Sequence, residues 1–195
     1  MKTLRTPLSI LTMALMAFSS SSAQKAVAPP PKPADSGPSL AVTMKFLQDK
    51  LGDIGKVTSV SFVQNTNDGS TSSNTFTNEF SNVAAYPDQC RISYHQKVTR
   101  DGATVADSDT WFSLRDVQDV VVKPWAQYQT EVNAGAGFPN FVVTSVNPPL
   151  TALLVRRPHN LSNHFSFTDA DLADRVAKAF THAVELCGGG SKDPF

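Results

Sequence analysis

The sequence predicts an α+β domain in which seven antiparallel strands form a half-open barrel or sandwich, with one helix before them and a capping helix after them. Three observations lead to this fold class. Apolar residues recur every three or four positions near both ends of residues 39–189, and every second position between them. Most neighbouring strands are joined by short connections, whereas parallel crossovers need a dozen residues or more. A chain of 195 residues accommodates one such domain.

Residues 1–23 have the composition of a signal peptide, because Lys2 and Arg5 precede an apolar run and small residues come before Gln24. The sequence therefore predicts an exported protein, periplasmic or extracellular. No later apolar stretch is long enough to span a bilayer. Without Lys2 and Arg5, 15 basic and 17 acidic residues remain. This balance does not favour nucleic acid as a partner.

Two terminal segments are predicted to lack regular structure. Residues 24–38 are rich in proline and poor in apolar side chains, which predicts a disordered linker. Residues 190–195 are predicted to form a disordered tail.

The first predicted helix begins at Ser39, a good N-cap residue, and ends at Gly55. Its apolar residues step by four and three, so one face must pack on the same domain. They are Leu40, Met44, Leu47, Leu51 and Ile54.

The seven predicted strands span residues 57–64, 75–83, 91–99, 104–114, 117–123, 141–146 and 150–156. The third alternates most clearly, since Ile92, Tyr94 and Val98 share one face and polar residues share the other. Asp101-Gly102 predicts a tight turn that pairs the third and fourth strands antiparallel. The last two strands are expected to form a final pair.

Two intervening segments predict loops. Residues 65–74 contain mainly turn-forming polar residues. Residues 125–139 are less regular, and Gly135, Gly137 and Pro139 favour a loop there.

The closing helix has Thr168 as its expected N-cap, with Asp171 three residues later, and Gly188 and Gly189 as its end. Its apolar stripe consists of Leu172, Val176, Phe180, Ala183, Val184 and Cys187. This stripe is expected to cover one open end of the barrel.

Cys90 and Cys187 are the two cysteines of the chain. An even number of cysteines in an exported protein predicts a disulfide, here one that ties the last turn of the closing helix to the start of the third strand. The alternative is two buried free thiols that pack as small hydrophobic side chains.

The order of seven strands and a final helix, ending in FSFTDADLADRVAKAF, resembles pleckstrin-homology-like folds. In those folds two nearly orthogonal sheets form a partly open barrel, and the helix plugs one end. The helix tryptophan typical of eukaryotic members is absent, and Val176 and Phe180 fill the stripe instead. This resemblance implies a fold and no particular activity.

Four segments resemble uncharacterised secreted bacterial proteins of a kind common in acidobacteria. They are PSLAVTMKFLQDKLGDIG, CRISYH, FSLRDVQDVVV and DADLADRVAKAFTHAVELCGG. This second resemblance supports export and implies no activity, cofactor or ligand.

Two groups of residues are candidates for binding an unknown protein or a small ligand. Trp125, Tyr128 and Phe138 fall in the predicted loop after the fifth strand, where aromatic side chains suit a binding site. The alternative is that they fold back over the core. Arg156 and Arg157, with a further cation, suit an anion site. Strand alternation instead predicts opposite faces for the two arginines and a surface ion pair. The further cations considered are Lys97, Arg100 and Lys123.

Catalysis has one candidate set. His95, with Asp107 or Asp109 on the next strand, is a minimal acid/base pair. The simpler interpretation is the solvated outer face of a hairpin. The four histidines lack metal-ligand spacing, and no nucleotide-binding or hydrolase motif occurs, so no metal or cofactor is predicted.

The sequence therefore favours a non-catalytic exported binding or interaction module. The alternatives are a small secreted hydrolase that uses His95, and a structural envelope component tethered through residues 24–38.

Overall fold

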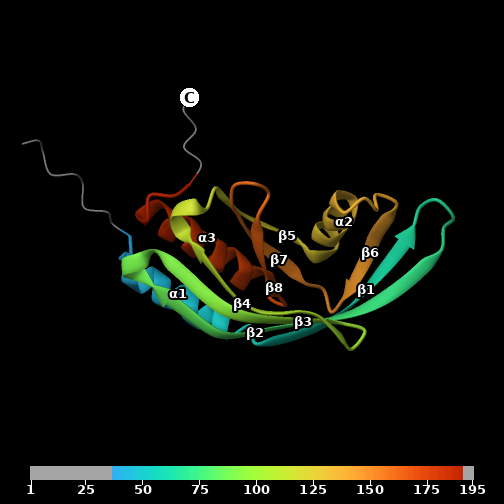
Figure 1. Ribbon diagram of the computed structural model, residues 1–195, viewed down its shortest axis with the longest axis horizontal. Coiled ribbons are helices and arrows are strands. Elements are labelled where there is room, and N and C mark those ends of the chain that lie inside the picture. The colour runs from blue at the N-terminus through green and yellow to red at the C-terminus, as the bar shows by residue number, and fades with distance from the viewer. Residues whose placement is uncertain (1–36, 191–195) are drawn as a thin grey trace, which may run out of the picture. The chain divides into compact units, whose positions relative to one another are not determined.

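The computed structural model describes residues 37–190 (Figure 1). The predicted signal peptide, most of the predicted linker and residues 191–195 of the predicted tail lie outside this range. The described helices are α1 (Leu40–Gly52), α2 (Trp125–Gly135) and α3 (Ala170–Leu186). The described strands are β1 (Lys56–Asn65), β2 (Thr71–Tyr86), β3 (Arg91–Arg100), β4 (Ala103–Ser113), β5 (Asp119–Pro124), β6 (Phe141–Asn147), β7 (Thr151–Arg156) and β8 (Ser162–Phe167). Two short 3-10 turns are η1 (Pro87–Gln89) and η2 (Leu114–Asp116).

The strands form two antiparallel sheets. The first has the order β4-β3-β2-β1-β6, and the second has the order β5-β7-β8. In Figure 1, β2, β3 and β4 run along one side of the domain, while β5, β7, α2 and α3 lie on the other. The α+β class and the antiparallel pairing are confirmed. The predicted number of seven strands is wrong, because residues 37–190 contain eight strands divided between two sheets. These residues form no closed barrel, so the predicted half-open barrel or sandwich is not confirmed.

The extra strand and the pairing of the last strands were both mispredicted. β8 was missed because only Phe165 and Phe167 mark its apolar face, next to a polar turn. β6 pairs with β1 in the larger sheet, and β7 pairs with β5 and β8. The predicted final pair of β6 and β7 is therefore wrong. The four central residues of β7 are all buried, as expected for a central strand covered on both faces.

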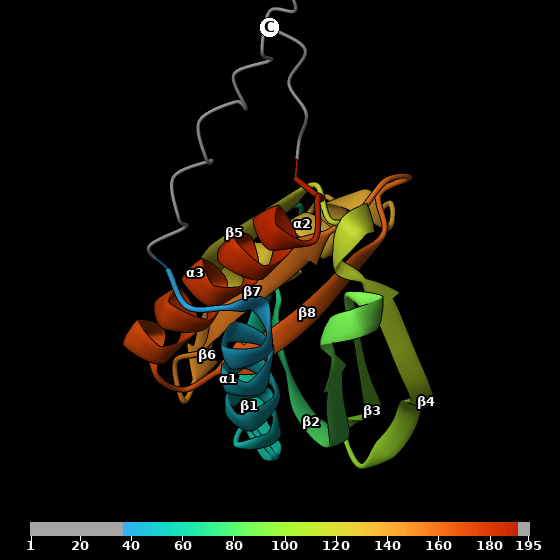
Figure 2. The same cartoon turned by 90° about the vertical axis from the view of Figure 1, so that its left-hand side faces the viewer.

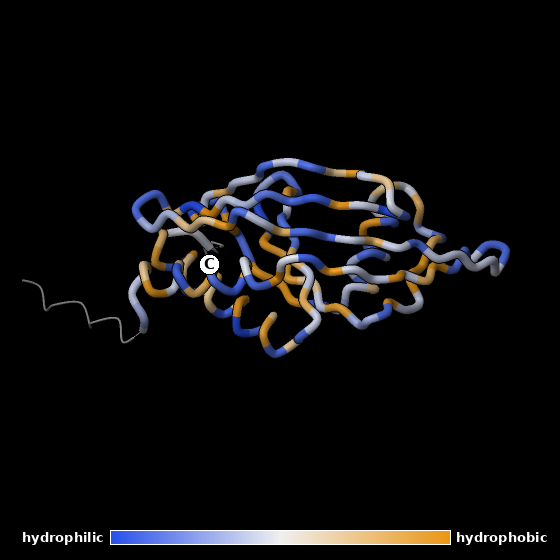
Figure 3. The backbone as a smooth tube through the Cα atoms, turned by 90° about the horizontal axis from the view of Figure 1, so that it is seen from below, coloured by the Kyte–Doolittle hydropathy of each residue, from blue (hydrophilic) through white to orange (hydrophobic). Residues whose placement is uncertain are grey.

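Local signals gave the correct structure in several places. Ser39 caps α1, since its Oγ accepts a hydrogen bond from the Val42 amide at 3.4 Å. Asp101 and Gly102 both have positive φ in the turn between β3 and β4, whose antiparallel pairing is confirmed. β2 begins at Thr71, inside the predicted polar loop, so the β1–β2 hairpin is longer than expected. Its tip is hydrophilic (Figure 3).

α3 lies along the three-stranded sheet and against α1 (Figure 2). Asp169, not Thr168, is its N-cap, because Asp169 Oδ1 accepts from the Leu172 amide at 3.1 Å. Its residues Val176 and Phe180 are fully buried. The predicted stripe is therefore the buried one, but it covers a sheet face instead of a barrel end.

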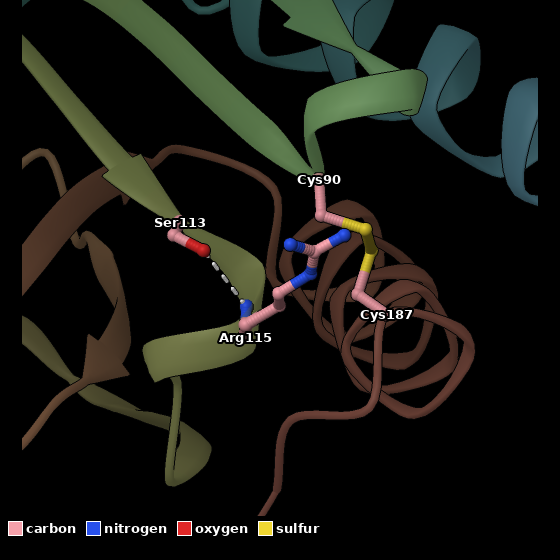
Figure 4. The surroundings of a disulfide bond; sticks show 4 residues. All are labelled: Cys90, Ser113, Arg115 and Cys187. Atoms are coloured by element: carbon pink, nitrogen blue, oxygen red, sulfur yellow. Dashed lines mark hydrogen bonds between the residues drawn. A yellow bond between two sulfur atoms is a disulfide. The ribbon is translucent and has the colours of Figure 1, made fainter.

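The disulfide between Cys90 and Cys187 is present and confirms the predicted pairing (Figure 4). Cys90 follows η1 at the start of β3, and Cys187 is the C-cap of α3. The alternative of two free thiols is excluded, since neither cysteine is free.

The three-stranded sheet separates two hydrophobic clusters. The larger one joins α1, α3 and the η1 end of the five-stranded sheet, and Phe165 and Phe180 stack within it at 6.1 Å between ring centroids. The smaller one contains Trp125, Leu150, Ala152 and Leu154. Because α2 supplies Trp125, this smaller cluster positions α2 over the half of the five-stranded sheet that is farther from η1.

Candidate functional site

α2 occupies most of the segment predicted to be a loop, and that prediction is wrong. The helix follows Pro124, and Gly137 takes a positive φ just after its end. Five of its residues recur with helical spacing and face inward: Trp125, Tyr128, Gln129, Val132 and Asn133. The pattern was missed because the stripe mixes aromatic and amide side chains, which lowers its apolar contrast.

A cavity of about 400 Å³ lies between this stripe and the inner face of the five-stranded sheet. β1, β2, β3 and β6 contribute every second residue to its floor, because successive side chains of a strand point to opposite faces of the sheet. Its lining consists of Ser61, Val63, Ser72, Asn74, Phe76, Asn78, Val98, Arg100, Trp125, Tyr128, Gln129, Val132, Asn133, Phe138, Phe141, Val143 and His164.

The three aromatic residues predicted as binding candidates, Trp125, Tyr128 and Phe138, therefore line one cavity. Trp125 is only 4% exposed and also belongs to the smaller hydrophobic cluster. The core interpretation therefore holds for Trp125, and its place in the lining keeps it a binding candidate. Another aromatic side chain, Trp111, lies apart on the outer face of β4 near Arg91 and is 63% exposed.

His164 completes an aromatic group at one end of the cavity. Its ring centroid lies 5.7 Å from that of Trp125 and 5.4 Å from that of Tyr128. Tyr128 Oη lies 3.2 Å from His164 Nδ1, within hydrogen-bond distance. Burial lowers the pKa of His164 to about 4 and raises the pKa of Tyr128. His164 is therefore neutral at physiological pH.

This depressed pKa predicts a pH-dependent loss of stability. Between about pH 6.5 and pH 4 the unfolded chain binds a proton at His164 that the folded chain does not, so the free energy of unfolding should fall by about 2 to 3 kcal/mol from this group as the pH is lowered. His164→Gln should flatten this part of the curve, which urea unfolding at a series of pH values would measure. An unchanged pH dependence in His164→Gln would contradict the prediction. His95 titrates in the opposite sense, because its pKa is raised.

The cavity floor is polar although it is buried. Ser61 Oγ donates to Gln129 Oε1 at 2.6 Å and ties β1 to α2. Asn78 is 3% exposed and lines the floor of the cavity. The Trp125 indole N–H lacks a partner in the described part of the chain, but its nitrogen has almost no accessible surface. Buried polar groups are normally hydrogen-bonded, so the Asn78 amide suits an occupant that carries a hydrogen-bonding group.

The sequence interpretation missed the floor residues Ser61, Asn74 and Asn78. Each occupies an inward position on its strand, yet a polar residue at such a position resembles one on a solvated face. The available signal was position parity, because each shares the face of a buried apolar neighbour such as Val63 or Phe80.

The mouth of the cavity combines a cation with exposed apolar groups. Arg100 is 54% exposed and is held by Asn74, whose Oδ1 accepts from Arg100 Nε at 3.0 Å and from Nη2 at 2.6 Å. Val132, Phe138 and Phe141 remain 48%, 58% and 39% exposed. The mouth is therefore amphipathic.

Arg156 and Arg157 line a second, polar cavity with Gln118, Asp119, Asn160, Leu161 and Ser162. Their guanidinium groups have different surroundings, as strand alternation predicts, since that of Arg157 lies 5.8 Å from the centroid of the Phe112 ring. The predicted ion pair is present, with Arg156 Nη1 3.5 Å from Asp119 Oδ2. The three further cations do not join them, since Arg100 lines the first cavity and Lys97 and Lys123 pair with Asp107 and Glu131.

His95, Asp107 and Asp109 converge on the outer face of β3 and β4. His95 Nδ1 lies 3.0 Å from Asp109 Oδ1, and His95 Nε2 lies 3.0 Å from Asp107 Oδ1. The hydrogen bond to Asp109, supported by the charge of Asp107, raises the pKa of His95. Asp109 is 89% exposed, and none of the three residues lines a cavity described above. The pairing predicted for a hydrolase exists, but on an open face.

Within residues 37–190, no three histidine, cysteine or acidic side chains gather closely enough to hold a metal ion. None of the helices in that range is both long and apolar enough to cross a membrane.

Comparison of the chain with protein-family models, curated proteins and solved structures found no match. The resemblances to pleckstrin-homology-like folds and to secreted acidobacterial proteins therefore stay predictions.

Proposed function

We propose that this protein is a non-catalytic, exported binding module that takes a small, mainly apolar ligand between α2 and the five-stranded sheet. The observation that carries this proposal is the cavity itself. Its volume of about 400 Å³ is within the range of small-molecule sites, and aromatic walls with a few convergent polar groups are typical of such sites. The Cys90–Cys187 disulfide supports an oxidising compartment, periplasmic or extracellular.

The alternatives have less support. The catalytic candidates around His95 lie outside the cavity, on an exposed face. The hypothesis of a tethered envelope component depends on residues 24–38, most of which lie outside the described range. Neither alternative uses the buried polar floor.

The proposal predicts that the neutral probe N-phenyl-1-naphthylamine binds and gains fluorescence in the cavity. Val132→Trp should weaken its binding at least about tenfold, because the larger side chain occupies space that the probe needs. Val42→Trp is the matched control, since Val42 is 59% exposed on α1 and does not line the cavity. Titration followed by fluorescence measures both variants. Absence of binding to the wild-type protein, or equal weakening in both variants, would contradict the proposal.

A further inference from the structure

Arg100 is the one residue with a formal charge in the described lining of the cavity. No aspartate or glutamate lines the cavity, and His164 is neutral because burial lowers its pKa to about 4. A single cation beside an uncharged lining favours an anionic group on the occupant, at the cavity mouth where Arg100 lies.

The Arg100 guanidinium is oriented but not fully used. Asn74 holds its Nε and Nη2 atoms, and Nη1 has no partner among residues 37–190. The nearest carboxylate, Asp101, has its Oδ2 atom 3.8 Å from Arg100 Nε. Its other oxygen, Oδ1, accepts from the Thr75 amide at 2.8 Å. A pre-positioned guanidinium with a free N–H edge suits a carboxylate, which accepts from it in a planar arrangement.

The rest of the lining suits a ring system. Aromatic side chains enter the cavity from β2, α2, β6 and the connection between α2 and β6, in the form of Phe76, Tyr128, Phe141 and Phe138. Phe138 and Phe141 meet edge to face, with ring centroids 6.1 Å apart and an interplanar angle of 81°. Offset and edge-to-face contacts are the arrangements that aromatic rings prefer, so a further aromatic ring is a favourable occupant.

We infer that the cavity takes an aromatic carboxylic acid, with its rings between α2 and the five-stranded sheet and its carboxylate on Arg100. This inference rests on the proposed function and specifies the class of ligand. The buried Asn78 amide provides a second polar contact on the floor, for a neutral oxygen or nitrogen on the ring system.

The test compares naphthalene-2-carboxylate with its neutral counterpart naphthalene-2-methanol by isothermal titration calorimetry. The carboxylate should bind the wild-type protein about tenfold or more tightly than the alcohol, because a hydrogen bond to a charged partner is stronger than one to a neutral partner. Arg100→Gln should remove that difference, because it should weaken binding of the carboxylate about tenfold or more and binding of the alcohol much less. Arg156→Gln is the matched control, since Arg156 lines the other cavity and should leave the difference intact.

The outcomes separate this inference from the proposed function. Equal affinities of the two probes, or a preference for the carboxylate that survives Arg100→Gln, would overturn the inference and leave the cavity as a binding site. Binding of neither probe, together with no binding of N-phenyl-1-naphthylamine, would overturn both. Urea unfolding of Arg100→Gln and Arg156→Gln confirms that each variant is folded.

Discussion

Replacing Phe180 by alanine is expected to lower the free energy of unfolding by about 3 to 5 kcal/mol. Phe180 is fully buried, and its ring stacks on Phe165 at 6.1 Å and on Phe112 at 6.3 Å between centroids. It therefore joins α3 to both sheets. The substitution removes apolar contact area and leaves a cavity that these rigid neighbours cannot fill by relaxing.

Urea unfolding of the oxidised protein measures this effect, with Lys178→Ala as the control. Lys178 is exposed on the same helix, so its replacement should change the free energy of unfolding by no more than about 0.5 kcal/mol. Phe180→Leu should fall between the two. A loss in Phe180→Ala no greater than that in Lys178→Ala would mean that α3 does not pack on the sheets as described.

Removal of the disulfide is expected to have an effect of similar size. Cys90 and Cys187 are 97 residues apart, and the chain-entropy model gives about 4 to 5 kcal/mol for a loop of this length. The bond restricts the unfolded chain far more than the folded one, because the end of α3 already lies at the start of β3. Cys187→Ser should therefore lose this stabilisation under oxidising conditions.

Two comparisons make the disulfide result specific. The double variant Cys90→Ser/Cys187→Ser should match Cys187→Ser, because either change breaks the same bond. The wild-type protein in a reducing agent should lose a similar amount, whereas the double variant should be insensitive to reduction. Equal stability of oxidised and reduced wild-type protein would show that the bond contributes nothing.

Local features of the structure could be predicted well. The cap at Ser39, the buried stripe around Leu47, the alternation of Ile92 and Tyr94 and the turn at Asp101 each depend on residues close together in the chain. Where a mixed pattern weakened the local signal, as in α2 and β8, prediction failed.

The candidate site could be predicted only in part. Trp125, Tyr128 and Phe138 were chosen for their chemistry, and the structure brings them to one cavity. Arg156 and Arg157 were chosen by the same reasoning, and the structure places them elsewhere. The two groups could not be separated in advance, because strand order and the position of α2 depend on pairings such as β6 with β1, which connect residues far apart in the chain.

The amino-acid sequence alone predicted the α+β class, the β3–β4 hairpin, the buried stripe of the last helix and the pairing of Cys90 with Cys187. These features follow from periodicity, turn chemistry and cysteine number, which are local or countable. Contacts between distant segments divide the strands into two sheets, place α3 over a sheet face, and turn Ser61, Asn78 and Arg100 toward a cavity. These features could not be predicted, because burial of a side chain depends on which distant segment covers it. A polar residue on the inner face of a strand has the same local pattern as one in water.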